Sequence, residues 1–311
     1  MKILVTGAAG FIGSHLTEAL VKEGHQILAI DALVPNLYPI EHKIRNWKLL
    51  GELGANVERR EIDLRKPIDE SEIADCDYIF HLAAMPGLSL SWEDTKLYID
   101  SNLLATANLI QACNPDRLSR FFHISTSSVY GKNVTGNEDS PLSPISPYGV
   151  TKLAAEALIS AYSKANYLSY TIFRLFSVYG PRQRSDMAFN IFTRKLLAGE
   201  VIDIYGDGTQ SRANTYVSDV VDGLISGIAN SEQGEIYNLC GSEQATVMEV
   251  LEKLAKITGR EPIIEFKGER LGDQQETKSV AQKAFKNLGF TPKVLLNEGL
   301  KRQVKWQLEN S

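Results

Sequence analysis

Short apolar runs alternate with segments of helical periodicity over the first 180 residues. The apolar runs predict buried strands over 3–6, 26–30, 57–62, 78–82, 121–125 and 170–175. Apolar residues spaced three or four positions apart predict helices over 11–23, 39–53, 95–112 and 148–165. This alternation predicts an α/β fold, a doubly wound parallel sheet with helices on both faces. Ligands of such sheets bind at the carboxyl ends of the strands.

The alternation is looser after residue 180. The pattern predicts a loop and a helix over 182–200, a strand and a turn over 202–208, and helices over 217–229 and 246–259. Ser218 is the predicted N-cap of the helix over 217–229, and Thr246 with Glu249 predicts a capping box for the next helix. We therefore expect a Rossmann-type domain over 1–180 and a smaller α/β substrate lobe over 181–311, with the chain weaving between them.

Composition narrows the class of protein. The 311 residues are 43% hydrophobic and 23% charged, which is ordinary for a water-soluble globular chain. A net charge of −5 does not favour nucleic acid as a partner. We expect no membrane partner, since we find neither a signal peptide nor an apolar run of spanning length. Cys76, Cys113 and Cys240 lie far apart, so we expect a cytoplasmic protein without a disulfide framework or a metal site.

A glycine motif follows the first predicted strand. In TGAAGFIGSH, Gly7, Gly10 and Gly13 form GxxGxxG at the start of a helix. The glycines allow a tight turn and a close approach of the backbone to a pyrophosphate, and the helix N-terminus supplies free N–H groups. The second strand ends at Asp31, eighteen residues after Gly13. A carboxylate there accepts a ribose 2′-hydroxyl and repels a 2′-phosphate, which favours NAD over NADP.

Two more strand ends fit the same groove. Asp63 and Leu64 follow the third strand, where an adenine can be met. HLAA, at 81–84, ends the fourth strand, and its small residues let a dinucleotide lie against the backbone. We interpret His81 as a packed strand residue and not as a catalyst.

Tyr148 and Lys152 form a YxxxK pair at the start of a predicted helix. The i, i+4 spacing places both side chains on one face. The pKa of an isolated tyrosine is about 10, and a neighbouring ammonium stabilises the phenolate. Tyr148 is therefore the predicted general base.

A run of three hydroxyl residues follows the fifth strand in HISTSSVYG. Ser and Thr are common at strand ends, where they bond the loop backbone. Thr126 also ends its strand beside the groove in which Tyr148 should lie. Its hydroxyl can therefore bind the reacting hydroxyl of a substrate, as a positioning group and not as a base.

Taken together, these motifs resemble the extended short-chain dehydrogenase/reductase family of NAD-dependent nucleotide-sugar epimerases and dehydratases. The resemblance rests on GxxGxxG, Asp31, HLAA, STSSVYG, YxxxK, RLFSVYGPRQR and GDGTQSR, and it extends from Met1 to Trp306. Within the family the chain is most similar to UDP-glucuronate 4-epimerases, through HISTSSVYG, SPYGVTK and VYGPRQR with the DMAF that follows.

The resemblance implies a mechanism and a set of contacts. Tyr148 takes the proton of the sugar 4-hydroxyl while hydride passes from carbon 4 to NAD⁺, the 4-keto sugar turns over, and hydride returns to its other face. Thr126, Tyr148 and Lys152 form the implied catalytic set. The implied cofactor contacts are Gly7, Gly10, Phe11, Ile12, Gly13, Asp31, Asp63, Leu64, Leu82, Ala83, Ala84, Asn102, Ser125, Tyr148 and Lys152. The implied substrate contacts are Met85, Gly87, Thr126, Ser127, Ser177, Arg184, Tyr205, Arg212, Arg270 and Asp273.

The hydroxyl run separates the reactions of this family. Similar dehydratases carry Asp-Glu after the catalytic threonine, and UDP-glucuronate decarboxylases carry Glu at the place of Ser128. Ser127 and Ser128 cannot act as general acids near neutral pH, which favours an epimerase. A 4-keto glucuronate loses CO₂ readily, so an epimerase must restrain the carboxylate, and Arg184 offers it a bidentate contact.

Several alternatives remain open at this stage. Ser177 stands where many family members have Asn, Ser89 stands where close relatives have Arg, and Arg212 is followed by Ala-Asn in place of Asp-Phe. A UDP-glucose or UDP-N-acetylglucosamine 4-epimerase, a UDP-glucuronate decarboxylase and a non-catalytic NAD-binding scaffold are the other interpretations. By resemblance, the helices over 95–112 and 148–165 also predict a homodimer.

Overall fold

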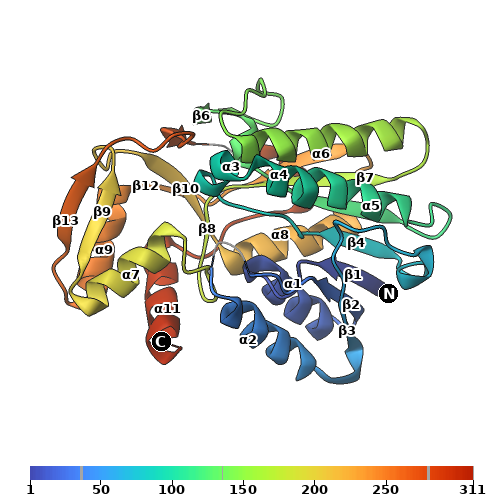
Figure 1. Ribbon diagram of the computed structural model, residues 1–311, viewed down its shortest axis with the longest axis horizontal. Helices are drawn as coiled ribbons and strands as arrows, with labels where there is room; N and C mark the ends of the chain where they lie inside the picture. Colours follow the sequence, from blue (N-terminus) through green and yellow to red (C-terminus); the bar gives the residue numbers. More distant parts are fainter. Residues whose placement is uncertain (36–37, 135, 279–280, 311) are drawn as a thin grey trace.

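The computed structural model describes residues 1–35, 38–134, 136–278 and 281–310. It contains a large sheet with helices on both faces and a smaller lobe at one end (Figure 1). In the described residues the large sheet has seven strands, all parallel, in the order β11, β7, β5, β4, β1, β2, β3. They are β1 (Lys2–Thr6), β2 (Gln26–Asp31), β3 (Val57–Glu61), β4 (Tyr78–His81), β5 (Arg120–Thr126), β7 (Tyr170–Leu175) and β11 (Glu235–Leu239).

Two layers of helices cover the large sheet. One face carries α1 (Phe11–Lys22), α2 (Ile40–Gly51) and α8 (Val217–Asn230) (Figure 1). The other face carries α3 (Ser89–Glu93), α4 (Thr95–Tyr98), α5 (Ala105–Gln111) and α6 (Pro147–Lys164). Short 3₁₀ turns occur at Gly54–Asn56, Glu70–Glu72 and Ser127–Val129. The predicted strands and helices of this region are confirmed to within two residues at their ends, apart from the helix over 95–112.

That helix contains a π-helical segment. α4 ends at Tyr98, a π-helix follows over Ile99–Leu104, and α5 begins at Ala105. A π-segment widens the turn and re-aims the side chains within it. Asn102 lies in this segment and is fully buried, with its amide bonded to the loop that follows β4.

The smaller lobe is built from two further sheets and their helices (Figure 1). One sheet contains β6 (Asn133–Val134), β8 (Val178–Tyr179), β10 (Ser211–Tyr216), β12 (Glu243–Thr246) and β14 (Glu276–Thr277). The other is the parallel pair of β9 (Val201–Tyr205) and β13 (Ile263–Lys267). The remaining helices are α7 (Ala188–Ala198), α9 (Val247–Thr258), α10 (Gln282–Leu288) and α11 (Leu296–Glu309).

The chain crosses between the two parts in both directions. β6 comes from the first 180 residues and pairs with β14. β11 comes from beyond residue 180 and pairs with β7 at the edge of the large sheet. A division at residue 180 therefore does not follow the sheets.

The structure tests two predicted helix caps. Thr246 and Glu249 form the predicted capping box at the start of α9. The prediction of Ser218 as the N-cap of α8 is wrong. Strand β10 continues to Tyr216, so α8 begins directly at Val217 and Ser218 lies inside its first turn.

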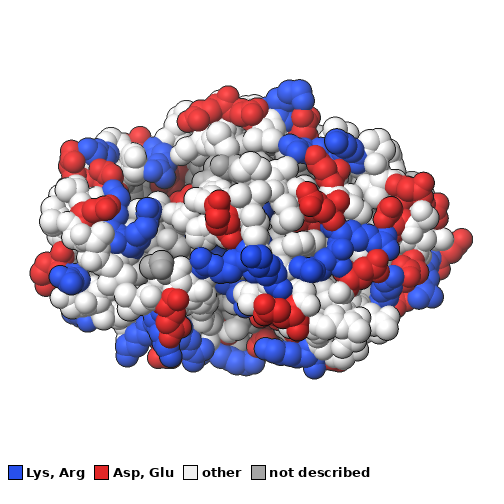
Figure 2. All heavy atoms as spheres, turned by 60° about the horizontal axis from the view of Figure 1, so that its bottom comes forward, with Lys and Arg blue, Asp and Glu red and all other residues white. Residues whose placement is uncertain are grey.

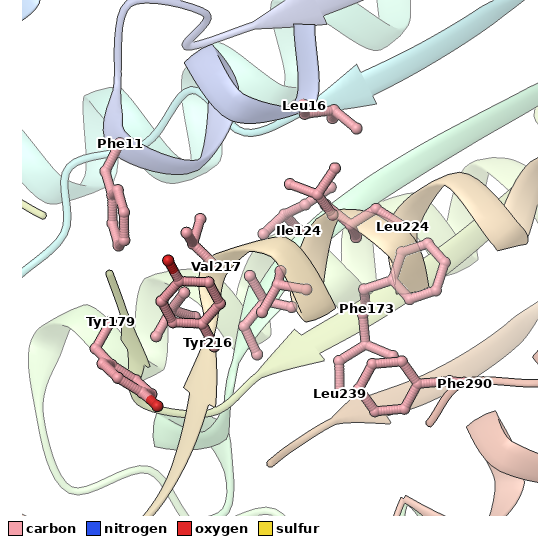
Figure 3. Packing of buried hydrophobic residues seen from close by; sticks show 14 of the residues in the cluster. Phe11, Leu16, Ile124, Phe173, Tyr179, Tyr216, Val217, Leu224, Leu239 and Phe290 are labelled. Carbon is pink, nitrogen blue, oxygen red and sulfur yellow. The ribbon is translucent and has the colours of Figure 1, made fainter. Parts of the chain in front are cut away.

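A single buried cluster joins α1, α8 and the strands (Figure 3). Leu16 of α1 and Leu224 of α8 are fully buried in it, as is Phe173 of β7. The same cluster continues through Ile202 of β9 and Leu254 of α9. The two parts of the molecule therefore share one hydrophobic core, which fixes the lobe relative to the carboxyl ends of the large sheet.

The surface carries both signs of charge. Figure 2 shows one face on which Lys and Arg side chains are interspersed with Asp and Glu, and neither sign covers that face. Within the described residues, no helix combines the length and the apolar character needed to cross a bilayer.

Candidate active site

A cavity of about 420 Å³ opens at the carboxyl ends of the large sheet. Its wall includes the turn after β1, the segments after β2 and β3, the loops after β4 and β7, the end of β5 and the start of α6, and the smaller lobe closes it with Arg212 and Asp273. The wall contains every residue predicted for the cofactor and the substrate except Asn102, Gly87, Tyr205 and Arg270. Residues far apart in the sequence therefore meet in one site.

The glycine turn lets three backbone segments meet at the cavity. Gly7 has a φ of +69°, and a Cβ on it would lie 2.8 Å from the backbone nitrogen of Ala83. A Cβ on Gly13 would lie 2.2 Å from the carbonyl oxygen of Gly7. Any side chain at these positions would push the turn, α1 and the loop after β4 apart. The space so preserved lies at the N-terminus of α1, where free N–H groups bind anions.

Asp31 is held at the end of β2 by three donors. Its carboxylate accepts hydrogen bonds from the backbone nitrogens of Ala9, at 3.1 Å, and Leu33, at 2.9 Å. Lys43 of α2 lies 3.2 Å away and lines the same cavity. The sequence analysis missed Lys43, because its helical position gives no signal that it reaches back to β2.

Tyr148 and Lys152 enter the cavity from the first two turns of α6. The N-terminus of this helix is stabilised, because the Ser146 hydroxyl accepts a hydrogen bond from the Gly149 nitrogen at 3.1 Å and Pro147 occupies the first helical position. Burial raises the pKa of Tyr148, whereas its hydrogen bond with Thr126 and the charge of Arg184 act in the opposite direction. The lowered pKa that the YxxxK pair predicts stays a prediction for the enzyme with its cofactor bound.

Lys152 is buried and bonded to a histidine. Its Nζ lies 3.2 Å from Nε2 of His123 on β5. Burial lowers the pKa of Lys152 to about 8, and the charge of Glu156 opposes this shift. The sequence analysis quoted His123 within HISTSSVYG but assigned no role to it. The i, i+4 rule does not reveal contacts between a helix and a strand.

The hydroxyl residues after β5 make different contacts. Thr126 caps the 3₁₀ turn, accepting from the Ser128 nitrogen at 3.1 Å, and its hydroxyl also lies on the cavity wall. Ser127 donates to Gln274 at 3.3 Å, which connects the end of β5 to a loop of the smaller lobe. Ser125 donates to the buried carboxylate of Glu156. Thr126 therefore has both of the properties that the sequence suggested, a loop cap and a cavity hydroxyl.

The two arginines on the wall that are predicted substrate contacts are each paired with an aspartate. Arg184 binds Asp186 through Nε and Nη2, both at 2.9 Å. Arg212 binds Asp273 through Nη2 at 2.7 Å. The sequence analysis predicted neither ion pair. Each pair partly neutralises the charge that the cavity offers to an acidic ligand.

Four predicted residues lie outside the cavity wall. Asn102 bonds both backbone groups of Met85, at 2.6 and 3.1 Å, and therefore holds the wall instead of forming it. Gly87 lies in the same loop with a φ of +96°. The guanidinium of Arg270 stacks on the ring of Tyr205 at 3.8 Å. Among the described residues, no cluster of His, Cys, Asp or Glu could hold a metal ion.

The chain is similar to known proteins along almost its whole length. The model of the NAD dependent epimerase/dehydratase family matches residues 3–240. An uncharacterized UDP-glucose epimerase of Bacillus subtilis strain 168 is 38% identical over 314 positions, covering 98% of both chains. A UDP-glucuronate 4-epimerase of Thermodesulfobacterium geofontis is 34% identical over 317 positions, covering 99% of this chain and 96% of the relative. The crystal structure of UDP-glucuronic acid 4-epimerase from Bacillus cereus, in complex with UDP-glucuronic acid and NAD, has a TM-score of 0.96 at 38% identity, covering 100% of both chains.

Proposed function

The chain belongs to the NAD-dependent epimerase/dehydratase family, and we propose that it inverts carbon 4 of UDP-glucuronate to give UDP-galacturonate. The observation that carries this proposal is the meeting of Thr126, Tyr148 and Lys152 on one cavity wall, followed by serines and not by acids. That set supports oxidation and reduction at one carbon without elimination.

The residues present fit NAD as the cofactor. The close approach of Gly7, Gly13 and Ala83 leaves a cradle that a Cβ would fill. Asp31 stands at the ribose position at the end of β2, and the N-terminus of α1 faces the pyrophosphate position. When bound, NAD accepts hydride from carbon 4, returns it to the other face, and adds a positive charge that favours a neighbouring phenolate.

The chain's own residues move and hold the proton. Tyr148 takes the proton from the 4-hydroxyl and returns it after the sugar has turned over. Thr126 holds that hydroxyl, and its bond with Tyr148 opposes the rise in the pKa of the phenol that burial causes. The ammonium of Lys152 stabilises the phenolate from the next turn of the helix.

Restraint of the carboxylate keeps the 4-keto sugar from losing CO₂. We assign this restraint to Arg184, assisted by the hydroxyls of Ser127 and Ser177 on the same wall. The salt bridge with Asp186 uses two of the five N–H donors of Arg184, so donors remain for a sugar carboxylate.

We assign the nucleotide to the smaller lobe. Arg212 lies on the cavity wall with Asp273, where the pair can meet a diphosphate and a ribose hydroxyl. Arg270, whose guanidinium stacks on the ring of Tyr205, is assigned to the diphosphate with Arg212, and the backbone around Tyr205 is assigned to the uracil.

A homodimer in the cytoplasm completes the proposal. Ile99, Leu104 and Val150 are apolar side chains that are 44%, 42% and 52% exposed on the helices that the family resemblance pairs across a two-fold axis. Burying such side chains against a second copy is favourable. Placement in the cytoplasm rests on the scattered cysteines, whose thiols at Cys76 and Cys113 are buried and unbridged.

A neutral UDP-hexose is the second candidate substrate. The pairing of Arg184 with Asp186 favours it, because the aspartate offsets the charge that would select a carboxylate. The name of the B. subtilis relative points the same way for that protein.

Proton NMR of the sugar anomeric signals tests the proposal directly. The purified protein is incubated with UDP-glucuronate and, separately, with UDP-glucose, with the Tyr148→Phe variant as control. Conversion of UDP-glucuronate to UDP-galacturonate without a UDP-pentose is the expected result. A UDP-pentose product would refute the restraint of the carboxylate, and conversion of UDP-glucose alone would refute the acidic substrate.

A further inference from the structure

We infer that His123 is a positioning residue that holds the ammonium of Lys152 beside Tyr148 by accepting its hydrogen bond as a neutral imidazole. The inference rests on the proposed function in one respect, that Tyr148 and Lys152 handle the proton. It adds a residue behind the cavity wall to the machinery of the site.

The geometry defines the tautomer of His123. Its Nε2 lies 3.2 Å from Nζ of Lys152, and both side chains are buried. An ammonium can only donate, so Nε2 must accept and the imidazole proton must reside on Nδ1. That Nδ1 is buried without a hydrogen-bond partner among the described residues. Leaving the buried Nδ1–H donor without a partner is unfavourable. The hydrogen bond from Lys152 to Nε2 outweighs this cost and therefore selects the tautomer.

His81 provides an internal comparison. It lies beside His123 on β4, with ring centroids 5.5 Å apart, and it is equally buried. Both of its ring nitrogens are bonded, to the hydroxyls of Thr6 at 2.8 Å and Thr106 at 3.0 Å. His81 is thus satisfied by neutral partners, whereas the one bonded nitrogen of His123 points at a charge.

The groups around His123 keep it neutral. Lys152 faces it from α6, His81 faces it from β4, and Ile172 is its apolar neighbour on β7. Glu156 of α6 carries the charge that acts on Lys152 from the other direction. Burial lowers the pKa of His123 well below its usual value, and the charge of Lys152 lowers it further. A protonated His123 would repel Lys152, so the neutral ring is the form that can serve as acceptor.

This acceptor matters because Lys152 loses its proton easily. With a pKa of about 8, the ammonium is only marginally favoured at neutral pH. Removing the acceptor should lower the pKa of Lys152, and weaker support for the phenolate should raise the pKa of Tyr148. His123 therefore keeps Lys152 charged up to a higher pH, so that its ammonium can support Tyr148 as the base.

Two pairs of variants test the inference. His123→Leu removes the acceptor, and His81→Leu makes the same change one strand away. His123→Gln keeps an acceptor near the place of Nε2, whereas His123→Asn is too short to reach Lys152. The Gln and Asn pair decides the question if the Leu variant does not fold.

The first measurement needs no turnover. In protein labelled at lysine Cε, the NMR signal absent from Lys152→Arg identifies Lys152, and a pH titration gives its pKa. We expect the pKa to fall by about one unit in His123→Leu and His123→Asn, and to stay near its original value in His123→Gln and His81→Leu. An unchanged pKa in both the Leu and Asn variants of His123 would overturn the inference.

The second measurement is the pH profile of kcat/KM with the sugar that the protein turns over. We expect the rising limb to move up and the falling limb to move down in His123→Asn, and both to return in His123→Gln. A rate lowered equally at every pH would make His123 a packing residue. If the unaltered protein converts neither UDP-glucuronate nor UDP-glucose, the proposed function fails, while the NMR titration still decides the role of His123.

Discussion

Glu156 and Arg174 form an ion pair in the interior, with Arg174 Nη2 at 2.7 Å from Glu156 Oε2 and side chains only 5% and 2% exposed. Glu156 lies on α6, two turns beyond Tyr148, and Arg174 lies on β7. Glu156 also accepts from Ser125 at the end of β5, and Arg174 donates to the hydroxyl of Tyr130 at 2.8 Å. The pair therefore fixes α6 to two strands directly behind the site.

Removing one partner of this pair should be strongly destabilising. Arg174→Met leaves the carboxylate of Glu156 buried and without its main partner, at a cost of about 3–5 kcal/mol of unfolding free energy. The double variant Arg174→Met with Glu156→Leu should lose much less, because no charge is left unpaired. Urea unfolding measures both variants, and equal losses would contradict this account.

Replacing the phenol of Tyr148 should strongly reduce turnover but leave cofactor binding intact. In Tyr148→Phe, turnover should fall by about 10²–10⁴-fold, because the general base is lost. The NAD content of the purified protein should be unchanged. Tyr98→Phe is the matched control, a buried tyrosine 6.2 Å from the ring of Tyr148 that donates only to the Pro86 carbonyl. It should keep most of the activity, and equal losses in the two variants would contradict the assigned base.

A methyl group at Gly13 should damage the NAD site. The added Cβ would lie 2.2 Å from the Gly7 carbonyl oxygen, so Gly13→Ala must shift the turn, at a cost of about 1–3 kcal/mol. We expect a lower melting temperature and less bound NAD, measured by thermal unfolding and by absorbance of the released cofactor. Gly268→Ala is the control, since a Cβ there meets nothing within 4 Å. If Gly13→Ala retained NAD, the close approach of the backbone at Gly13 would not be required for cofactor binding.

Loss of the Arg184 charge should affect the acidic substrate selectively. Arg184→Gln removes a charge-assisted contact, so the KM for UDP-glucuronate should rise by about tenfold or more, with little change for UDP-glucose. The share of UDP-pentose product should also rise, because the carboxylate is no longer restrained. Steady-state kinetics and product NMR measure the two effects. An equal loss for both sugars would show that Arg184 does not select the carboxylate.

The free energy of unfolding should decrease as the pH is lowered, because His15 is forced to take a proton. Burial and the charge of Arg182 lower the pKa of His15 from 6.5 to about 4. The unfolded chain therefore binds more protons between these pH values, and unfolding becomes easier as the pH falls from 6.5 to about 4. Because the side chain is partly exposed, we expect the free energy of unfolding to decrease by about 2 kcal/mol over this range. In His15→Gln, which can still donate to the Pro181 carbonyl, the pH dependence of urea unfolding should be shallower by that amount.

The local chemistry of the site could be predicted from the sequence. The turn at Gly7 and Gly13, the carboxylate of Asp31 and the spacing of Tyr148 and Lys152 all depend on residues close together in the chain. Backbone freedom and helical periodicity are local properties, so a single sequence reveals them. The alternation of strands and helices follows for the same reason, and it predicted a parallel sheet with helices on both faces.

Long-range packing decided the rest. β11 completes the large sheet by pairing with the open edge of β7, a strand far from it in the sequence. His123 contacts Lys152, which lies 29 positions away in the sequence. Asn102 reaches Met85 from a π-helical segment that the pattern of apolar residues does not predict. The raised pKa of Tyr148 depends on burial by distant segments. Charge pairing and desolvation are set by three-dimensional neighbours, so only the tertiary structure determines how these local motifs act.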